Sequence, residues 1–189
     1  MPRPPRPLFP NATYHVTARR CASGPLFVDS HDRATLLAIV SDVVGRHAWT
    51  CLSYCLMTTH FHLLLTTPNA DLAKGMQRLN SNYATSFNRR YDASGHVFES
   101  RYGAELIQGD GHLLETCRYI PLNPVRAGLC IDPADWRWSS FRATVGEEPA
   151  PDFLDAGSLL RLFGPDDGSA RARFRAFVDD ANSLQGLTP

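Results

Sequence analysis

Two histidines separated by one residue, His60 and His62, are the side chains of this sequence best suited to carry chemistry. They lie in the segment Thr-Thr-His-Phe-His-Leu-Leu-Leu, whose apolar residues predict a strand over 60–66. Side chains alternate between the faces of a strand, so both imidazoles share one face while Phe61 points to the other. Imidazole is the commonest metal ligand in proteins, and the pair could hold one divalent cation. Two half-buried histidines with ordinary hydrogen bonds would show the same spacing, so the pair alone leaves both interpretations open.

Tyr119 supplies a candidate nucleophile. The helix expected over 111–123 has an apolar stripe formed by Leu113, Cys117 and Ile120. At 100° per residue Tyr119 lies about 120° from Leu113, away from this stripe, and Asn123 shares its side one turn later. A tyrosine in that position could reach a site on the sheet. Pro121 leaves open whether the helix continues to Asn123, because proline removes a helical hydrogen bond.

Tyr83 is the competing tyrosine. A long helix is predicted over 72–90, and its apolar face comprises Leu72, Met76, Leu79, Tyr83 and Phe87. Because Tyr83 belongs to that face, packing in the core accounts for it. Tyr119 is therefore the preferred nucleophile.

These residues must be positioned by an α+β domain. Strands are expected over 11–18, 49–56, 60–66 and 101–108, and helices over 29–47, 72–90 and 109–124. The order is βαββαβ followed by a helix, which is typical of the ferredoxin-like and RRM-like antiparallel sheet. With the helices on one face, the other face of the sheet would be free for His60 and His62.

Three segments are expected along the chain. Residues 1–11 are rich in proline and read as an extended basic arm. Residues 12–145 form the domain that carries the candidate site. Residues 146–189 form a helical C-terminal extension, with helices near 155–163 and 168–181 separated by Gly164-Pro165.

The net charge of zero conceals an uneven distribution. Residues 1–20 hold four arginines and no acid, and residues 72–102 hold five basic against two acidic residues, whereas 145–189 hold four arginines against eight acids. The two basic stretches favour a nucleic acid partner, with scattered solvated charge as the alternative. Five cysteines without a C-x-x-C motif predict buried free thiols in a reducing compartment. The sequence shows neither a signal peptide core nor a membrane-length apolar run, so a cytoplasmic protein without a membrane partner is expected.

Three motifs, in this order, resemble those of the REP-associated tyrosine transposases, a branch of the single-tyrosine HUH transposases of bacterial insertion sequences. They are MTTHFHLLL at 57–65, GHVFESRY at 95–102 and YIPLNPVRAGL at 119–129, followed by Trp138-Ser-Ser. The likeness covers about residues 8–145. Thr58-Thr59 departs from the pattern, since many relatives carry Pro-Asn or Pro-Glu there.

The resemblance implies an endonuclease and strand transferase that acts on single-stranded hairpin DNA in transposition or recombination. His60 and His62 match the family's metal ligands, Tyr119 matches the nucleophile, and Asn123 matches the position that can complete the metal site. A Mg²⁺ or Mn²⁺ ion would polarise the scissile phosphate. Attack by the tyrosine would then give a 5′-phosphotyrosine and a free 3′-OH. Such enzymes act as monomers or homodimers.

Arginines near the expected site are candidates for phosphate contacts. The candidate DNA-binding residues are Arg89, Arg90 and Arg101, Arg126 in the third motif, and Arg3 and Arg6 in the basic arm. Tyr91 and Phe98 could stack on bases. For Arg89 and Arg90 the alternative is that they simply complement the C-terminal end of a helix dipole.

Two other functions remain open from the residues. An RRM-like binding module would expose aromatic residues on its sheet, but the sequence lacks the Lys/Arg-Gly-Phe-Gly-Phe signature. A metallohydrolase would use the histidines with water and would not need Tyr119. A domesticated transposase with weak cleavage would keep the same motifs.

Overall fold

The computed structural model of the chain describes residues 8–21 and 24–185, without the side chains of residues 167 and 181–185. Arg3 and Arg6, and most of the expected basic arm, therefore lie outside the described residues. The elements in chain order are β1 (Ala12–Arg19), α1 (Ser30–His47), β2 (Thr50–Leu56), β3 (His60–Thr67), α2 (Leu72–Arg90), β4 (Gly103–Leu106), α3 (Gly109–Arg126), the 3-10 turn η1 (Pro133–Asp135), α4 (Phe141–Val145), α5 (Ala156–Leu160) and α6 (Asp167–Gln185).

The four strands form one antiparallel sheet in the order β2-β3-β1-β4. This is the strand order of the ferredoxin-like fold. The two strands of each βαβ unit, β1 with β2 and β3 with β4, run parallel to each other and are separated by one strand of the other unit. The predicted α+β fold class is confirmed. The fourth strand is shorter than expected, and the helix that follows it is longer.

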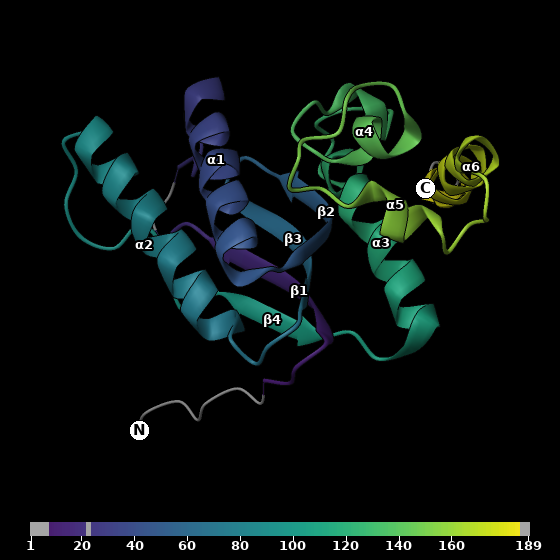
Figure 1. The fold of residues 1–189 in the computed structure, drawn as a ribbon. Helices are drawn as coiled ribbons and strands as arrows, with labels where there is room; N and C mark the ends of the chain where they lie inside the picture. Colours follow the sequence, from purple (N-terminus) through teal and green to yellow (C-terminus); the bar gives the residue numbers. More distant parts are fainter. Residues whose placement is uncertain (1–7, 22–23, 186–189) are drawn as a thin grey trace.

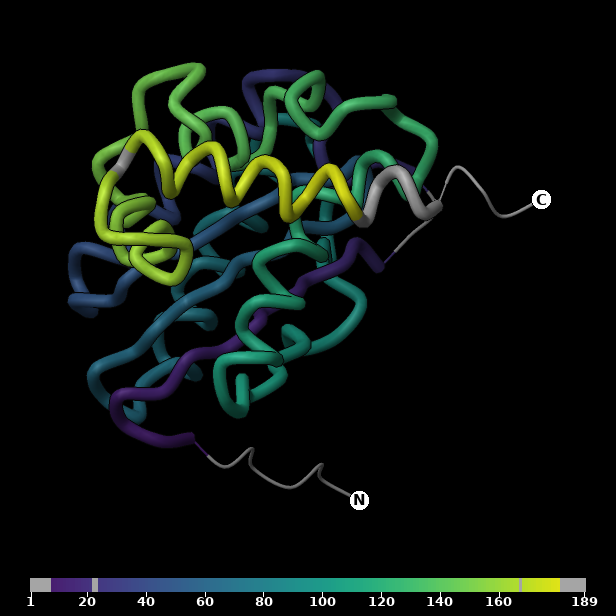
Figure 2. Tube along the Cα trace, turned by 90° about the vertical axis from the view of Figure 1, so that its right-hand side faces the viewer, coloured from purple at the N-terminus to yellow at the C-terminus, as the bar shows by residue number. Residues whose placement is uncertain are grey.

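Helices cover both faces of the sheet. Figure 1 shows α1 and α2 on one side of the strands and α3 to α6 on the other. Figure 2 views the second side, where α6 and α3 lie in front of the strands. The expectation that one face would be left free is therefore wrong, although α1 and α2 do share a face as predicted.

Alternation along the strands builds the first core, between the sheet and α1 and α2. Val16 of β1 and Phe61 and Leu63 of β3 are fully buried there. Leu36 of α1 and Met76 of α2 pack against them, also fully buried. This is the ordinary alternation of a half-buried strand, and it places the intervening residues on the opposite face.

The second core lies on the face that carries the histidines. Leu64 is two residues from His62, so it shares that face, and it is completely buried against Cys117 and Ile120 of α3. Phe174 of α6 belongs to the same cluster. The histidine face of β3 thus changes from polar to apolar along its length, and the apolar part is what α3 covers. The C-terminal helices complete this core rather than forming a separate layer.

The helix α3 continues through Pro121 and Pro124. Proline has no amide hydrogen, so Pro124 cannot donate to the carbonyl of Ile120 one turn earlier. The side-chain Nδ2 of Asn123 donates to that carbonyl at 3.4 Å and to the carbonyl of Tyr119 at 2.8 Å. Asn123 therefore replaces a missing backbone donor, and Tyr119 and Asn123 do share one continuous helix.

Within the described residues, no helix is long and apolar enough to cross a membrane.

The contact between α2 and the start of β2 depends on a glycine. A Cβ atom at Gly75 would overlap the indole ring of Trp49, whose Nε1 donates to Asp71 at 2.9 Å. We expect Gly75→Ala to destabilise the protein by about 1–3 kcal/mol through overpacking, although alanine favours a helix. The matched substitution Gly45→Ala, in α1 with no atom within 4 Å of the added Cβ, should be neutral or stabilising by up to about 1 kcal/mol. Urea denaturation of the two variants checks this, and equal effects would contradict it.

Candidate active site

The histidine pair and the predicted nucleophile meet on one face of the sheet. The ring centroids of His60 and His62 lie 4.9 Å apart on β3. The ring of Tyr119, on α3, lies 5.7 Å from that of His62 and nearly perpendicular to it. Residues about 60 positions apart in the sequence therefore form one cluster of candidate catalytic side chains.

His15 joins this cluster, and the sequence analysis missed it. Its Nε2 lies 2.9 Å from Nδ1 of His62, and the two rings meet edge to edge, nearly coplanar, with centroids 5.1 Å apart and an interplanar angle of 18°. Its ring also lies 5.8 Å from Tyr119 in an edge contact. The signal in the sequence was the alternation of β1, since Tyr14 and Val16 are buried in the first core and His15 between them must face the other way.

Burial keeps the histidine pair neutral. It is the main cause that lowers the pKa of His62 to about 3, with smaller contributions from the nearby His15, His60 and Arg19. Burial also lowers the pKa of His60 to about 4, with a contribution from Arg19. Both imidazoles are therefore neutral at pH 7, and the neutral imidazole is the form that can bind a metal ion.

The donor atoms fit a divalent cation held partly by oxygen. Nε2 of His62 is buried and lacks a hydrogen-bond partner in the described part of the chain, which is unusual for a buried polar atom. Among the described residues, no three His, Cys, Asp or Glu side chains converge as a metal site. Further ligands would have to be amide, water or phosphate oxygens. Because Nδ2 of Asn123 is bonded to the helix backbone, Oδ1 is its atom left for such a role.

Tyr119 is accessible as well as close to the histidines. It is 37% exposed, whereas the neighbouring His62 is only 4% exposed. The guanidinium of Arg126 lies 5.0 Å from the centre of its ring, on the ring face, in a cation–π contact. The helix phase predicted from the apolar stripe is the phase observed.

Tyr83 lies on the other side of the sheet. It is 1% exposed, and its hydroxyl donates to the carbonyl oxygen of Leu26 at 2.7 Å. Burial raises the pKa of this hydroxyl well above its usual range. The prediction that Tyr83 packs in the core is confirmed by this environment.

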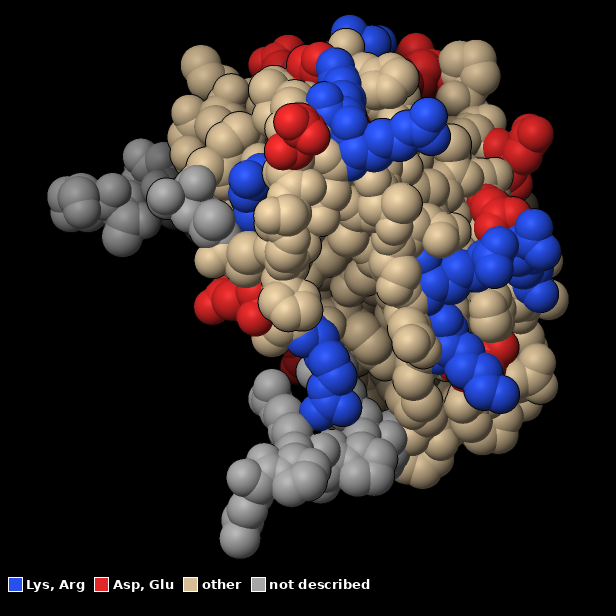
Figure 3. Space-filling view, turned by 90° about the vertical axis from the view of Figure 1, so that its left-hand side faces the viewer, with Lys and Arg blue, Asp and Glu red and all other residues tan. Residues whose placement is uncertain are grey.

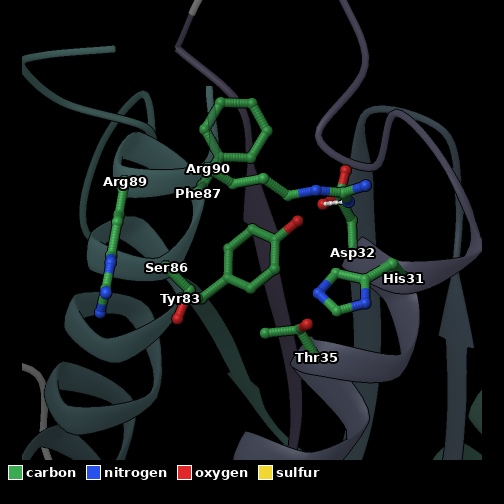
Figure 4. A pocket seen from close by; sticks show the side chains of 8 residues that line it. All are labelled: His31, Asp32, Thr35, Tyr83, Ser86, Phe87, Arg89 and Arg90. Atoms are coloured by element: carbon green, nitrogen blue, oxygen red, sulfur yellow. Dashed lines mark hydrogen bonds and ion pairs between the residues drawn. The ribbon is translucent and has the colours of Figure 1, made fainter. Parts of the chain in front are cut away.

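Arg90 is exposed but forms ion pairs with two acidic residues of another element. Its guanidinium donates to Asp29, the N-cap of α1, and to the buried Asp32 at 2.5 Å. Figure 4 shows the ion pair of Arg90 with Asp32 at the edge of a pocket of about 370 Å³ between α1 and α2, which Arg89 also lines. Tyr91 also donates to Asp32, at 2.8 Å. Arg90 and Tyr91 thus join α2 to α1.

The other candidates for DNA contact lie at the surface. Arg89, Arg101 and Arg126 are exposed. Phe98 packs partly buried against Phe61 and Tyr83, which leaves it a limited surface for stacking. Figure 3, which views the side of the molecule that carries α2, shows Lys and Arg in separate groups with acidic residues among them.

Arg89 and Arg90 are neighbours in the sequence but differ in their contacts, and this difference can be tested. We expect Arg90→Gln to lower the urea midpoint of unfolding, because it removes the partner of a buried carboxylate. Arg89→Gln should leave the midpoint unchanged and weaken DNA binding instead. A fall in stability for Arg89→Gln alone would contradict the structural assignment of Arg90.

Comparisons with known proteins agree with the family resemblance of the three sequence motifs. A protein of Haemophilus influenzae (strain ATCC 51907 / DSM 11121 / KW20 / Rd) described as a REP-associated tyrosine transposase is 24% identical over 163 residues, covering 74% of this chain and 89% of its own length. A solved structure of a REP-associated tyrosine transposase bound to a REP hairpin matches with a TM-score of 0.68 and 18% identity, covering 82% of this chain and 94% of that one. The model of the family "Transposase IS200 like" matches residues 9–123.

The chain belongs to the IS200-like transposase family. The expected resemblance to REP-associated tyrosine transposases is confirmed by the curated relative and by the solved fold. The matched segment contains all the clustered residues, namely His15, His60, His62 and Tyr119, and it ends at Asn123.

Proposed function

We propose that this IS200-like transposase is a metal-dependent strand transferase that cleaves and rejoins single-stranded DNA beside a hairpin. The observation that carries the proposal is the approach of Tyr119, partly exposed on α3, to the neutral pair His60 and His62 on β3. A nucleophile beside two imidazoles with available lone pairs is the arrangement that this reaction requires.

In the proposed reaction the Tyr119 hydroxyl loses its proton to solvent, and the resulting phenolate oxygen attacks the scissile phosphorus. The new bond joins this oxygen to phosphorus, and the bond between phosphorus and the 3′ oxygen breaks. The products are a 5′-phosphotyrosine and a 3′ oxygen that takes up a proton. Attack by a 3′-OH on the phosphotyrosine reverses these changes and rejoins a strand without ATP, because the number of phosphodiester bonds is conserved.

His60 and His62 would hold the cation, with Oδ1 of Asn123 as a further ligand. A bound Mg²⁺ or Mn²⁺ would polarise the phosphate and neutralise charge that develops on its oxygens. Two imidazole ligands are softer than the oxygen ligands that Mg²⁺ prefers, so Mn²⁺ should bind more tightly in vitro.

A DNA hairpin is the substrate we propose, because the solved relative is bound to a REP hairpin. Arg101 and Arg126 are exposed, and Arg126 lies directly over the ring of Tyr119, where it could contact a phosphate next to the scissile one. Arg89 is a more distant candidate. The reaction would take place in the cytoplasm, with a monomer or homodimer as the active species.

A covalent-capture assay tests the nucleophile. Incubation with labelled hairpin DNA carrying a single-stranded flank, in Mg²⁺ or Mn²⁺, should give a protein–DNA adduct that survives denaturation. Tyr119→Phe should abolish the adduct, because the attacking oxygen is removed, whereas Tyr83→Phe should retain it once folding is verified.

The outcomes separate the alternatives. Loss of the adduct only in Tyr83→Phe would overturn the choice of nucleophile. Tight DNA binding without an adduct from any hairpin tested would favour a binding module. Cleavage that persists in Tyr119→Phe would favour a metallohydrolase that uses water.

The metal site has its own test. We expect His60→Ala and EDTA treatment each to abolish Mn²⁺ binding in calorimetry. Adduct formation should fall more than about 100-fold, beyond the range usual for changes outside the ligand set. Full adduct formation in EDTA would contradict the proposed role of the histidine pair.

A further inference from the structure

We propose that His15 is a positioning residue of the metal site, which accepts a hydrogen bond from Nδ1 of His62 and thereby directs the lone pair of Nε2 toward the cation. This inference rests on the proposed function and assigns a role to a residue outside the His-Phe-His motif. It follows from the contacts of the two rings and from the chemistry of imidazole.

The geometry fixes which nitrogens are paired. Nε2 of His15 and Nδ1 of His62 are 2.9 Å apart, a normal hydrogen-bond length. The only other ring nitrogen of His62, Nε2, is buried and without a hydrogen-bond partner among the described residues. Within the described part of the chain, the hydrogen bond that can decide the tautomer of His62 is therefore the one at Nδ1.

Two tautomeric arrangements satisfy the bond between the rings, and they differ at Nε2. If His15 donates, Nε2 of His62 carries the hydrogen, which has no acceptor and prevents ligation. If His62 donates from Nδ1, Nε2 carries a lone pair, which a cation can take. Metal-bound histidines commonly donate their second ring N–H to a neighbouring acceptor, and this donation fixes the tautomer and the ring orientation.

The sheet holds His15 in place for this role. In the antiparallel register His62 lies opposite Thr17 and Leu64 lies opposite His15, so the two histidines are diagonal neighbours on one face. Their rings are nearly coplanar, at 18°, and each makes an edge contact with Tyr119, at 5.8 Å from His15 and 5.7 Å from His62. The pair of rings thus also forms the surface against which the nucleophile rests.

Three substitutions separate a hydrogen bond from ring packing. His15→Phe keeps a ring but removes the acceptor. His15→Gln keeps an acceptor, because its Oε1 lies about as far from the backbone as Nε2 of histidine. His96→Phe makes the same change as His15→Phe at an exposed histidine outside the site, and serves as the control.

The first measurement is the tautomer of His62 in the metal-free wild type, by long-range ¹H–¹⁵N NMR at neutral pH, with His62→Gln to assign the signals. We expect the Nδ1–H form. The second is Mn²⁺ affinity by calorimetry. The Kd should rise roughly 10–100-fold in His15→Phe and stay near the wild-type value in His15→Gln and His96→Phe.

Each contrary result has one meaning. An Nε2–H tautomer in the wild type would overturn the proposal without any variant, even if His15→Phe fails to fold. Unchanged Mn²⁺ affinity in folded His15→Phe would also overturn it, as would equal weakening in His15→Gln. Wild-type Mn²⁺ binding without a DNA adduct would overturn the proposed reaction but not the role of His15.

Discussion

The antiparallel pairing of β1 with β3 is the interaction on which the site depends. It joins strands separated by about 40 residues and sets a register in which Thr17 lies opposite His62. A shift of one residue would turn each side chain of β1 to the other face of the sheet. The buried Val16 and Phe61 oppose such a shift, because both belong to the first core and would lose it. The packing of one face thus determines which side chains meet on the other.

The change from polar to apolar side chains along one face of β3 decides where α3, the helix with Tyr119, lies. The face that carries His60 and His62 becomes apolar at Leu64, and α3 covers that apolar part through Cys117 and Ile120. Tyr119 stands between these two positions on a different side of the helix and therefore reaches the histidines at the boundary. The Asn123 amide supports the backbone at this point, where two prolines remove donors.

Local sequence patterns predicted much of this arrangement, but they did not predict the contacts between residues far apart in the sequence. The shared face of His60 and His62, the phase of Tyr119 and the burial of Tyr83 follow from the periods of a strand and a helix. The role of Leu64 was missed because a short apolar run does not show which of its faces another element covers. His15 was missed because its partner is set by strand pairing, and the ion pair of Arg90 with Asp32 joins residues 58 positions apart. The precise partner of a charged side chain is not encoded in the residues beside it.

The division into two cores on opposite faces of one sheet affects how the sequence can vary. A change of volume in the first core, for example at Leu36 or Met76, is separated from Tyr119 by the strands of the sheet. A similar change in the second core, at Cys117 or Phe174, shifts α3 relative to the sheet and with it the hydroxyl of Tyr119. Substitutions among homologues should therefore be tolerated in the first core as long as the protein still folds. In the second core, each substitution must be matched by a compensating one.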